Sequence, residues 1–105
     1  MTTNDPFATP QAPTRTQVLN TAKNIINGSR RQEYGSPKDS FERIAQLWTI
    51  TLGHAVTAHE VALCMAQLKI ARLVQTPTGA DSWIDLAGYA ALGAEVAGAT
   101  VEEAH

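Results

Sequence analysis

Apolar residues recur every three or four positions through most of the chain, which is the spacing of one face of an α-helix. This pattern predicts four helices and no strand. The first helix is expected to run from Thr14 to Ser29, and Gly28 marks its end because glycine commonly follows the last helical turn. Its apolar positions are Val18, Leu19, Ala22, Ile25 and Ile26.

The second helix has the clearest start. Ser36 is expected to be its N-cap, and Pro37 occupies the first helical position. Asp39 occupies the capping-box position, from which a side chain reaches back to the backbone N–H of the N-cap residue. Gly53 marks the end of the helix. The apolar stripe of this helix is Phe41, Ile44, Ala45, Trp48 and Leu52.

The third helix is expected to begin at a second capping box, formed by Thr57 and Glu60. It stops in the segment QTPTGAD, because Pro77 and Gly79 cannot continue a helix. Its apolar stripe is Val61, Cys64, Met65, Leu68 and Ala71. As the single cysteine of the chain, Cys64 forms no internal disulfide, and its place in the stripe predicts a small core residue.

The fourth helix is expected to open with Asp81 as N-cap, and it is rich in small residues. Its apolar positions include Trp83, Ile84, Ala87, Gly88, Ala91, Leu92 and Val96. Two glycines inside a helix cost about 1 kcal/mol each relative to alanine, and close approach of another backbone would offset that cost. The partner is either the third helix or the same helix of a second subunit. Trp48 and Trp83 are expected in the core, whereas the Tyr89 hydroxyl needs a partner or water.

The length of 105 residues corresponds to one domain. Residues 1–13 contain three of the five prolines and are predicted to be a flexible leader, residues 14–100 a single helical domain, and residues 101–105 a frayed tail. The predicted fold is a compact all-α four-helix domain in which the third and fourth helices form a hairpin. A core of this size is often completed by association, so we expect a homo-oligomer. The chain has neither a secretory signal nor the ~20 apolar residues that span a bilayer, so we expect a cytoplasmic protein without a membrane partner.

The net charge of −2 conceals two halves of opposite sign. Between Arg15 and Ile44, six cations face three acids, and from His59 onward two cations face six acids. The basic half can meet an anion, or it can meet the acidic half of the same chain or of a neighbour. A net negative charge argues against bulk nucleic-acid binding, which depends on many phosphate contacts.

Cations gather around the start of the second helix, in RRQEYGSPKD. A helix start presents unpaired backbone N–H groups and a partial positive charge, so it favours phosphate or carboxylate. Arg30, Arg31 and Lys38 flank this helix start, next to Ser36, and arginine suits phosphate recognition. Tyr34 offers a ring for stacking, and Gly35 permits a tight turn; both belong to the predicted site. Capping alone accounts for Ser36, Pro37 and Asp39, but not for the arginines or the Tyr-Gly pair.

A second set of charges lies on the predicted hairpin. Lys69 and Arg72 share one helical face, as do Asp81 and Asp85. Folding the hairpin brings Arg72 near Asp81 and Asp85, which predicts a half-buried salt-bridge network. If Lys69 and Arg72 stay unpaired, they extend the phosphate site instead. If Asp81 and Asp85 converge with Glu60, the three carboxylates could bind magnesium.

Three blocks, RRQEYGSPKDSFERIAQLW, VALCMAQLKIARL and DSWIDLAGYAAL, resemble a small domain of unknown function from bacteriophage and prophage genomes. More loosely, the all-α plan with an acidic fourth helix is similar to the MazG-type nucleotide pyrophosphohydrolases, which bind magnesium through a Glu-Glu-x-x-Glu helix and a Glu-x-x-Asp helix. Here Glu60 is the single acid of the third helix, and the fourth helix has Asp81-x-x-x-Asp85. The resemblance to the phage domain implies a viral setting but no established activity. The looser similarity to the MazG-type enzymes implies nucleotide chemistry.

The sequence therefore leads to three hypotheses. The first is a phage-type binding protein that sequesters a nucleotide or nucleotide-derived signal without a cofactor, using Arg30, Arg31, Lys38 and Tyr34, with Lys69 and Arg72 as second-rank contacts. The alternative is a magnesium-dependent nucleotide pyrophosphohydrolase that uses Glu60, Asp81 and Asp85. The third is a structural or protein-interaction module.

Overall fold

The computed structural model of the protein describes residues 11–28 and 35–100. These residues form four α-helices and no strand: α1 (Arg15–Asn27), α3 (Pro37–Leu52), α4 (Ala58–Gln75) and α5 (Ala80–Ala97). The all-α class is confirmed, and each predicted helix has its counterpart. The expected tail and most of the expected leader lie outside the described residues.

The helix starts follow from local hydrogen bonds. At α4 both halves of the predicted capping box form: the Thr57 N–H donates to Glu60 Oε1 at 2.9 Å, and the Glu60 N–H donates to Thr57 Oγ1 at 3.3 Å. At α3 the Asp39 N–H donates to Ser36 Oγ at 3.2 Å, so Asp39 takes part in the cap through its backbone. Gly53 ends α3 in the left-handed conformation, with φ of 78°.

The predicted N-cap of α5 is wrong. The cap is Gly79, which has no side chain to accept a hydrogen bond, and Asp81 lies inside the first turn. The Gly79 carbonyl accepts from the Ser82 and Trp83 N–H groups, at 3.0 and 3.3 Å, and this turn starts the helix two residues earlier than expected. Asp81 still stabilises the helix start, because a carboxylate there interacts favourably with the helix dipole.

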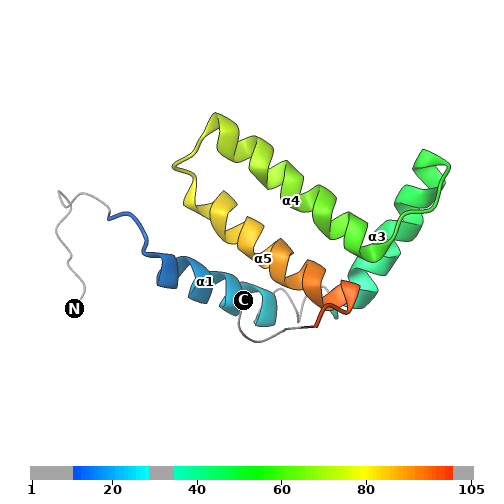
Figure 1. Ribbon diagram of the computed structural model, residues 1–105, viewed down its shortest axis with the longest axis horizontal. Coiled ribbons are helices and arrows are strands. Elements are labelled where there is room, and N and C mark those ends of the chain that lie inside the picture. Colours follow the sequence, from blue (N-terminus) through cyan, green and yellow to red (C-terminus); the bar gives the residue numbers. More distant parts are fainter. Residues whose placement is uncertain (1–10, 29–34, 101–105) are drawn as a thin grey trace.

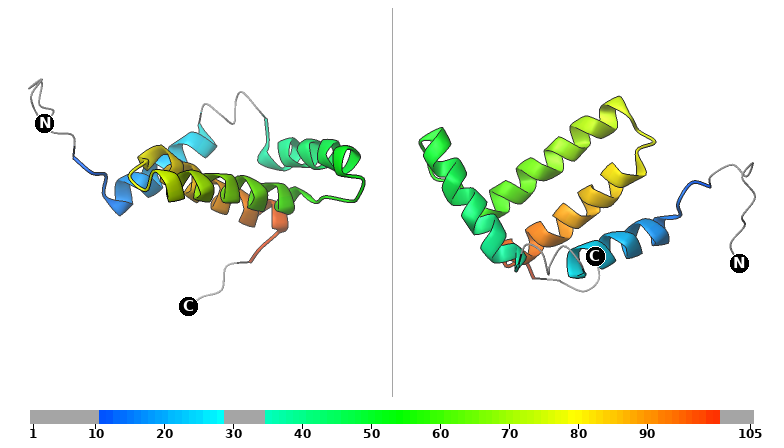
Figure 2. Two further views of the ribbon diagram at one scale, coloured as in Figure 1. Left: turned by 90° about the horizontal axis from the view of Figure 1, so that it is seen from above. Right: turned by 180° about the vertical axis from the view of Figure 1, so that it is seen from behind.

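The helix α5 is the centre of the fold, since it packs against α1, α3 and α4. Figure 1 shows α1, α5 and α4 side by side, with α4 and α5 as the antiparallel hairpin that the sequence predicts. The helix α3 crosses one end of this layer, and both views in Figure 2 place it on one side of the hairpin. Figure 1 looks on the opposite side of the hairpin, which α3 leaves uncovered.

The buried core is small and lies where α3 meets the hairpin. In the described part of the chain the buried apolar residues are Ala22, Phe41, Ala45, Val61, Ala62 and Leu73. Val61 is completely buried, and Trp48 packs partly buried against this cluster, as expected. The core is thin, as the length of the chain predicts.

The predicted orientation of α4 is only partly right. Val61 and Met65 do face the core, but Cys64, Leu68 and Ala71 are exposed, and Ala62 and Leu73 are buried in their place. Apolar side chains lie on nearly every side of this helix, so the sequence favours several stripes about equally.

Trp83 is also outside the core, with 47% of its surface exposed. Its indole Nε1–H donates to the Pro77 carbonyl at 2.9 Å, which holds the ring against the α4–α5 turn. The hydrogen bond explains this position, because an indole N–H needs an acceptor that an apolar core does not offer.

The two glycines inside α5 allow close helix contacts, as predicted. A Cβ at Gly93 would lie 3.1 Å from the Ala62 Cβ of α4, and a Cβ at Gly88 would lie 3.3 Å from Ile26 Cγ2 of α1. Close packing within one chain therefore accounts for both glycines.

Candidate functional site

A groove with a volume of about 480 Å³ lies between the start of α3 and the hairpin. All four helices or their flanking residues contribute to its lining, which comprises Ile26, Gly35, Pro37, Ser40, Phe41, Ile44, Lys69, Asp85, Tyr89 and Leu92. Pockets of roughly 300–1,000 Å³ with an apolar lining and a few polar groups are typical of small-molecule sites. A neighbouring cavity between α1 and α5 measures about 30 Å³ and has room for little more than water.

The charged wall of the groove is an ion pair across the hairpin. Lys69 Nζ of α4 lies 2.9 Å from Asp85 Oδ2 of α5, and the two side chains are only 12% and 19% exposed. Among the described residues, Asp85 thus forms an ion pair with Lys69. The sequence analysis had instead predicted Arg72 as its partner. Lys69 points toward α5, whereas Arg72, three residues later, is exposed and does not line the groove.

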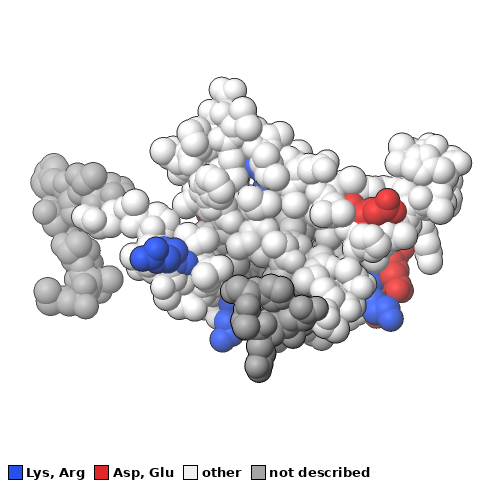
Figure 3. All heavy atoms as spheres, in the orientation of Figure 1, with Lys and Arg blue, Asp and Glu red and all other residues white. Residues whose placement is uncertain are grey.

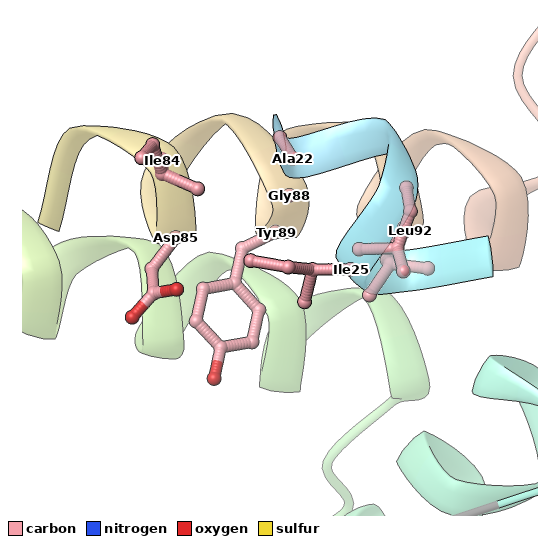
Figure 4. A pocket seen from close by; sticks show the side chains of 8 residues that line it. Ala22, Ile25, Ile84, Asp85, Gly88, Tyr89 and Leu92 are labelled. Carbon is pink, nitrogen blue, oxygen red and sulfur yellow. The ribbon is translucent and has the colours of Figure 1, made fainter. Parts of the chain in front are cut away.

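The aromatic wall of the groove comes from Tyr89 and Phe41, whose ring centroids are 6.5 Å apart with the planes tilted by 30°. Figure 4 shows the Tyr89 hydroxyl and the Asp85 carboxylate directed to the same side of α5. Within the described residues the Tyr89 hydroxyl makes no hydrogen bond. It is a donor that a ligand or water in the groove can use.

The start of α3 forms the third wall. Pro37 has no N–H, and the Asp39 N–H already donates to Ser36, so the helix start offers fewer free donors than a typical one. Gly35 lines the groove with φ of 78°, and nothing lies within 4 Å of the place where its Cβ would be. Lys38 is exposed in the first turn, where its charge adds to that of the helix dipole.

Only some of the predicted site residues line the groove. Gly35 and Lys69 line the groove, and Ser36 and Lys38 belong to the helix start beside it. Arg72 lies away from it. Arg30, Arg31 and Tyr34 lie outside the described residues.

The three carboxylates of the magnesium hypothesis do not meet in one chain. Glu60 and Asp81 stand in the first turns of α4 and α5, and the starts of two antiparallel helices are at opposite ends of the hairpin. The length of α4, 18 residues, corresponds to about 27 Å. Nowhere in residues 11–28 and 35–100 do three His, Cys, Asp or Glu side chains gather as a metal site would require.

Glu60 has a structural role instead. The Thr57 backbone N–H and hydroxyl both donate to its carboxylate, at 2.9 and 3.0 Å. These hydrogen bonds favour the charged form and hold the pKa of Glu60 below its ordinary value, with smaller contributions from His59 and His54. The charge of Glu60 therefore serves the α4 cap.

Sequence reasoning did not place Phe41, Ile44 or Tyr89 in the site. Phe41 and Ile44 follow the helical period and were assigned to the core, which they also form. Tyr89 carried a signal, because a phenol on an otherwise small-residue helix needs a place for its hydroxyl.

The fold and the groove define a small all-α domain with an open, partly aromatic pocket and a half-buried ion pair. Residues 17–97 match a family described as "Domain of unknown function (DUF6378)", and the chain belongs to that family. This membership confirms the resemblance to a domain of unknown function.

Two curated relatives are bacteriophage proteins. The chain is 46% identical over 74 residues to the Gene 55 protein of Mycobacterium phage L5, covering 70% of this chain and 47% of that protein. It is 38% identical over 73 residues to the Gene 55 protein of Mycobacterium phage D29, covering 70% and 48%. The chain thus spans about half the length of these relatives. No solved structure matches it significantly. In the described part of the chain, no helix has the length and apolar character needed to cross a bilayer.

Proposed function

We propose that this chain binds a small phosphate-bearing ligand, a nucleotide or a nucleotide-derived signal, in the groove at the start of α3. The observation that carries the proposal is the meeting of an aromatic wall, a half-buried ion pair and a helix start around about 480 Å³. An apolar pocket with a few convergent polar groups is the usual setting for a small-molecule site.

The chemistry of the walls supports one orientation of a nucleotide. A flat base would lie against Tyr89 and the apolar side chains of Ile44 and Leu92, with its amino group donating to the Asp85 carboxylate. The phosphates would lie at the α3 end, because the helix dipole would attract them.

At that end Lys38 would hold the phosphates. Arg30, Arg31 and Tyr34 come just before Gly35 in the chain, and they remain part of the proposal as further phosphate and base contacts. The two curated relatives are phage proteins. In such a setting we propose that the chain sequesters a nucleotide signal of the host.

The test is calorimetric titration and thermal shift with nucleoside mono- and triphosphates and cyclic dinucleotides, with and without magnesium. We expect a saturable shift for at least one of them, and about a tenfold weaker affinity in Lys38→Gln, which corresponds to about 1.4 kcal/mol. Lys23→Gln, which removes an exposed cation of α1, is the matched control and should bind normally.

Three outcomes would count against the proposal. Absence of any shift would favour an interaction module. Equal loss of binding in Lys23→Gln and Lys38→Gln would show a diffuse charge effect. Release of pyrophosphate that Asp85→Asn abolishes would favour hydrolysis over sequestration.

A further inference from the structure

On the side of the α4–α5 hairpin that faces away from α3, each helix presents a stripe, that is, a row of mostly apolar side chains. The α4 stripe contains Leu63, Gln67, Ile70 and Val74, and the α5 stripe contains Trp83, Ala87, Ala90 and Ala94. Residues spaced in this way lie on one side of a helix. We call the two stripes together the outer hairpin face.

Both stripes point to the same side of the hairpin. Met65 of α4 and Leu92 of α5 pack against the core cluster, to which α3 contributes. Two side chains that are two residues apart on a helix point about 200° away from each other. Leu63 is two residues from Met65, and Ala90 and Ala94 are each two residues from Leu92, so these three side chains point away from α3. In Figures 1 and 2 this side is the uncovered one.

The outer hairpin face is uncharged and, apart from Gln67, apolar, and most of its residues are exposed. Leu63, Ile70 and Val74 are 58%, 48% and 81% exposed. Figure 3 looks on this side, and the described atoms over α4 and α5 are almost all white. A small blue area is visible between them, and the other charged residues lie toward the edges. A helix that is apolar on nearly every side, as α4 is, is normally buried on every side.

The two halves of the face are complementary in size. The α4 stripe presents large side chains, and the α5 stripe presents alanines from Ala87 to Ala94, with Trp83 at the turn end, so the Leu63 end of α4 of one copy fits over the alanines of another. A two-fold axis parallel to the helices and between them makes both such contacts at once. We propose that the outer hairpin face binds a second copy of this chain, with α4 of each copy over α5 of the other.

The register within the hairpin fixes which residues would meet. Ala62 lies beside Gly93, so Leu63 is level with Leu92 of its own chain. A two-fold axis along the helices preserves that level, and Leu63 would therefore enter the space between the partner's Ala90 and Ala94. The absence of charge suits a contact between identical surfaces, since like charges would otherwise face each other.

The helix dimensions give the approximate size of the face. Each helix has 18 residues and is about 27 Å long, and two helices side by side are about 20 Å wide. The outline is roughly 500 Å², the same order as the ~800 Å² that each partner buries in a standard interface.

The experiment is sedimentation velocity on the full chain and its variants, with circular dichroism to verify helix content. The unmodified chain should be a dimer, and Leu63→Glu and Ala90→Lys should each be monomeric and still helical. Ile50→Glu is the matched control: Ile50 is 79% exposed but lies on α3, and this variant should remain dimeric.

An equimolar mixture of Leu63→Glu and Ala90→Lys should recover the dimer, because the new charges face each other only if α4 lies over α5 of the partner. A monomeric unmodified chain, or a Leu63→Glu chain that stays dimeric, would overturn the proposal. Failure of the mixture to pair would overturn the α4-over-α5 arrangement, and a dimer lost in Ile50→Glu alone would place the interface on α3.

Discussion

Gly93 of α5 lies directly against Ala62 of α4, so closely that a Cβ on the glycine would be 3.1 Å from the Ala62 Cβ. This contact sets the distance between the two helices of the hairpin. Ala62 itself is 2% exposed, so it has little space into which to move.

Gly93→Leu should therefore destabilise the protein by about 1–3 kcal/mol, the usual range for overpacking. Ala71→Leu, at an exposed position of α4, is the matched control and should change the free energy of unfolding by less than about 0.5 kcal/mol. Chemical denaturation measures both values. Equal effects of the two changes would show that the close contact does not limit packing.

The ion pair between Lys69 and Asp85 leads to a second prediction. Lys69→Met removes the α4 cation that pairs with the Asp85 carboxylate, and we expect the free energy of unfolding to fall by about 0.5–1.5 kcal/mol. Arg72→Met, at an exposed position of the same helix outside the groove, should lie within about 0.5 kcal/mol of the unmodified chain. Denaturant titrations compare the two, and a larger effect of Arg72→Met would contradict the pairing.

A third prediction concerns the α4 cap and pH. The folded pKa of Glu60 is lowered from its ordinary value of 4.5, so its charge stabilises the folded state above that pH, and this contribution is lost as the pH falls through the lowered pKa. The unmodified chain should be more stable than Glu60→Gln near neutral pH, and the difference should shrink in acid. Melting temperatures measured across this range test the sign. A difference that grows in acid would contradict it.

Gly53 provides a fourth prediction. It ends α3 with φ of 78°, and its N–H donates to the Thr49 carbonyl at 2.9 Å. Gly53→Ala should cost about 1–2 kcal/mol, because a Cβ is unfavourable in the left-handed conformation. Gly53→Asn should cost less, because asparagine adopts this conformation more readily. Thermal unfolding measures the order of stability of the two variants. An alanine variant as stable as the asparagine variant would contradict the prediction that a Cβ is strained at this position.

The parts of the fold that could be predicted are those decided by local chemistry. The α3 start at Ser36, the α4 start at Thr57 and the α3 end at Gly53 depend on hydrogen bonds and φ values within a few residues. The α5 start was misplaced because the cap is Gly79, and a glycine cap carries no side-chain signal.

The orientation of α4 could not be predicted, for a physical reason. Apolar periodicity selects a buried face only when the other faces are polar, and α4 has Leu63 and Ile70 on its exposed side. The error moved Cys64 into the predicted core.

The candidate site was predicted in part. Gly35 and Lys69 were identified from glycine next to a helix start and from charge spacing, and both line the groove. Phe41 and Tyr89 were not, because their meeting depends on how α3 crosses α5, a tertiary contact without a local signal.

The most direct test of the central proposal, ligand binding at the start of α3, is an NMR titration of the isotope-labelled chain with ATP and with a cyclic dinucleotide. We predict that the amide resonances of Gly35, Ser40 and Tyr89 shift and saturate with at least one compound, while those of Leu63 and Ala90 stay in place. Resonances that stay unchanged around the groove, or that shift only elsewhere, would contradict the proposal.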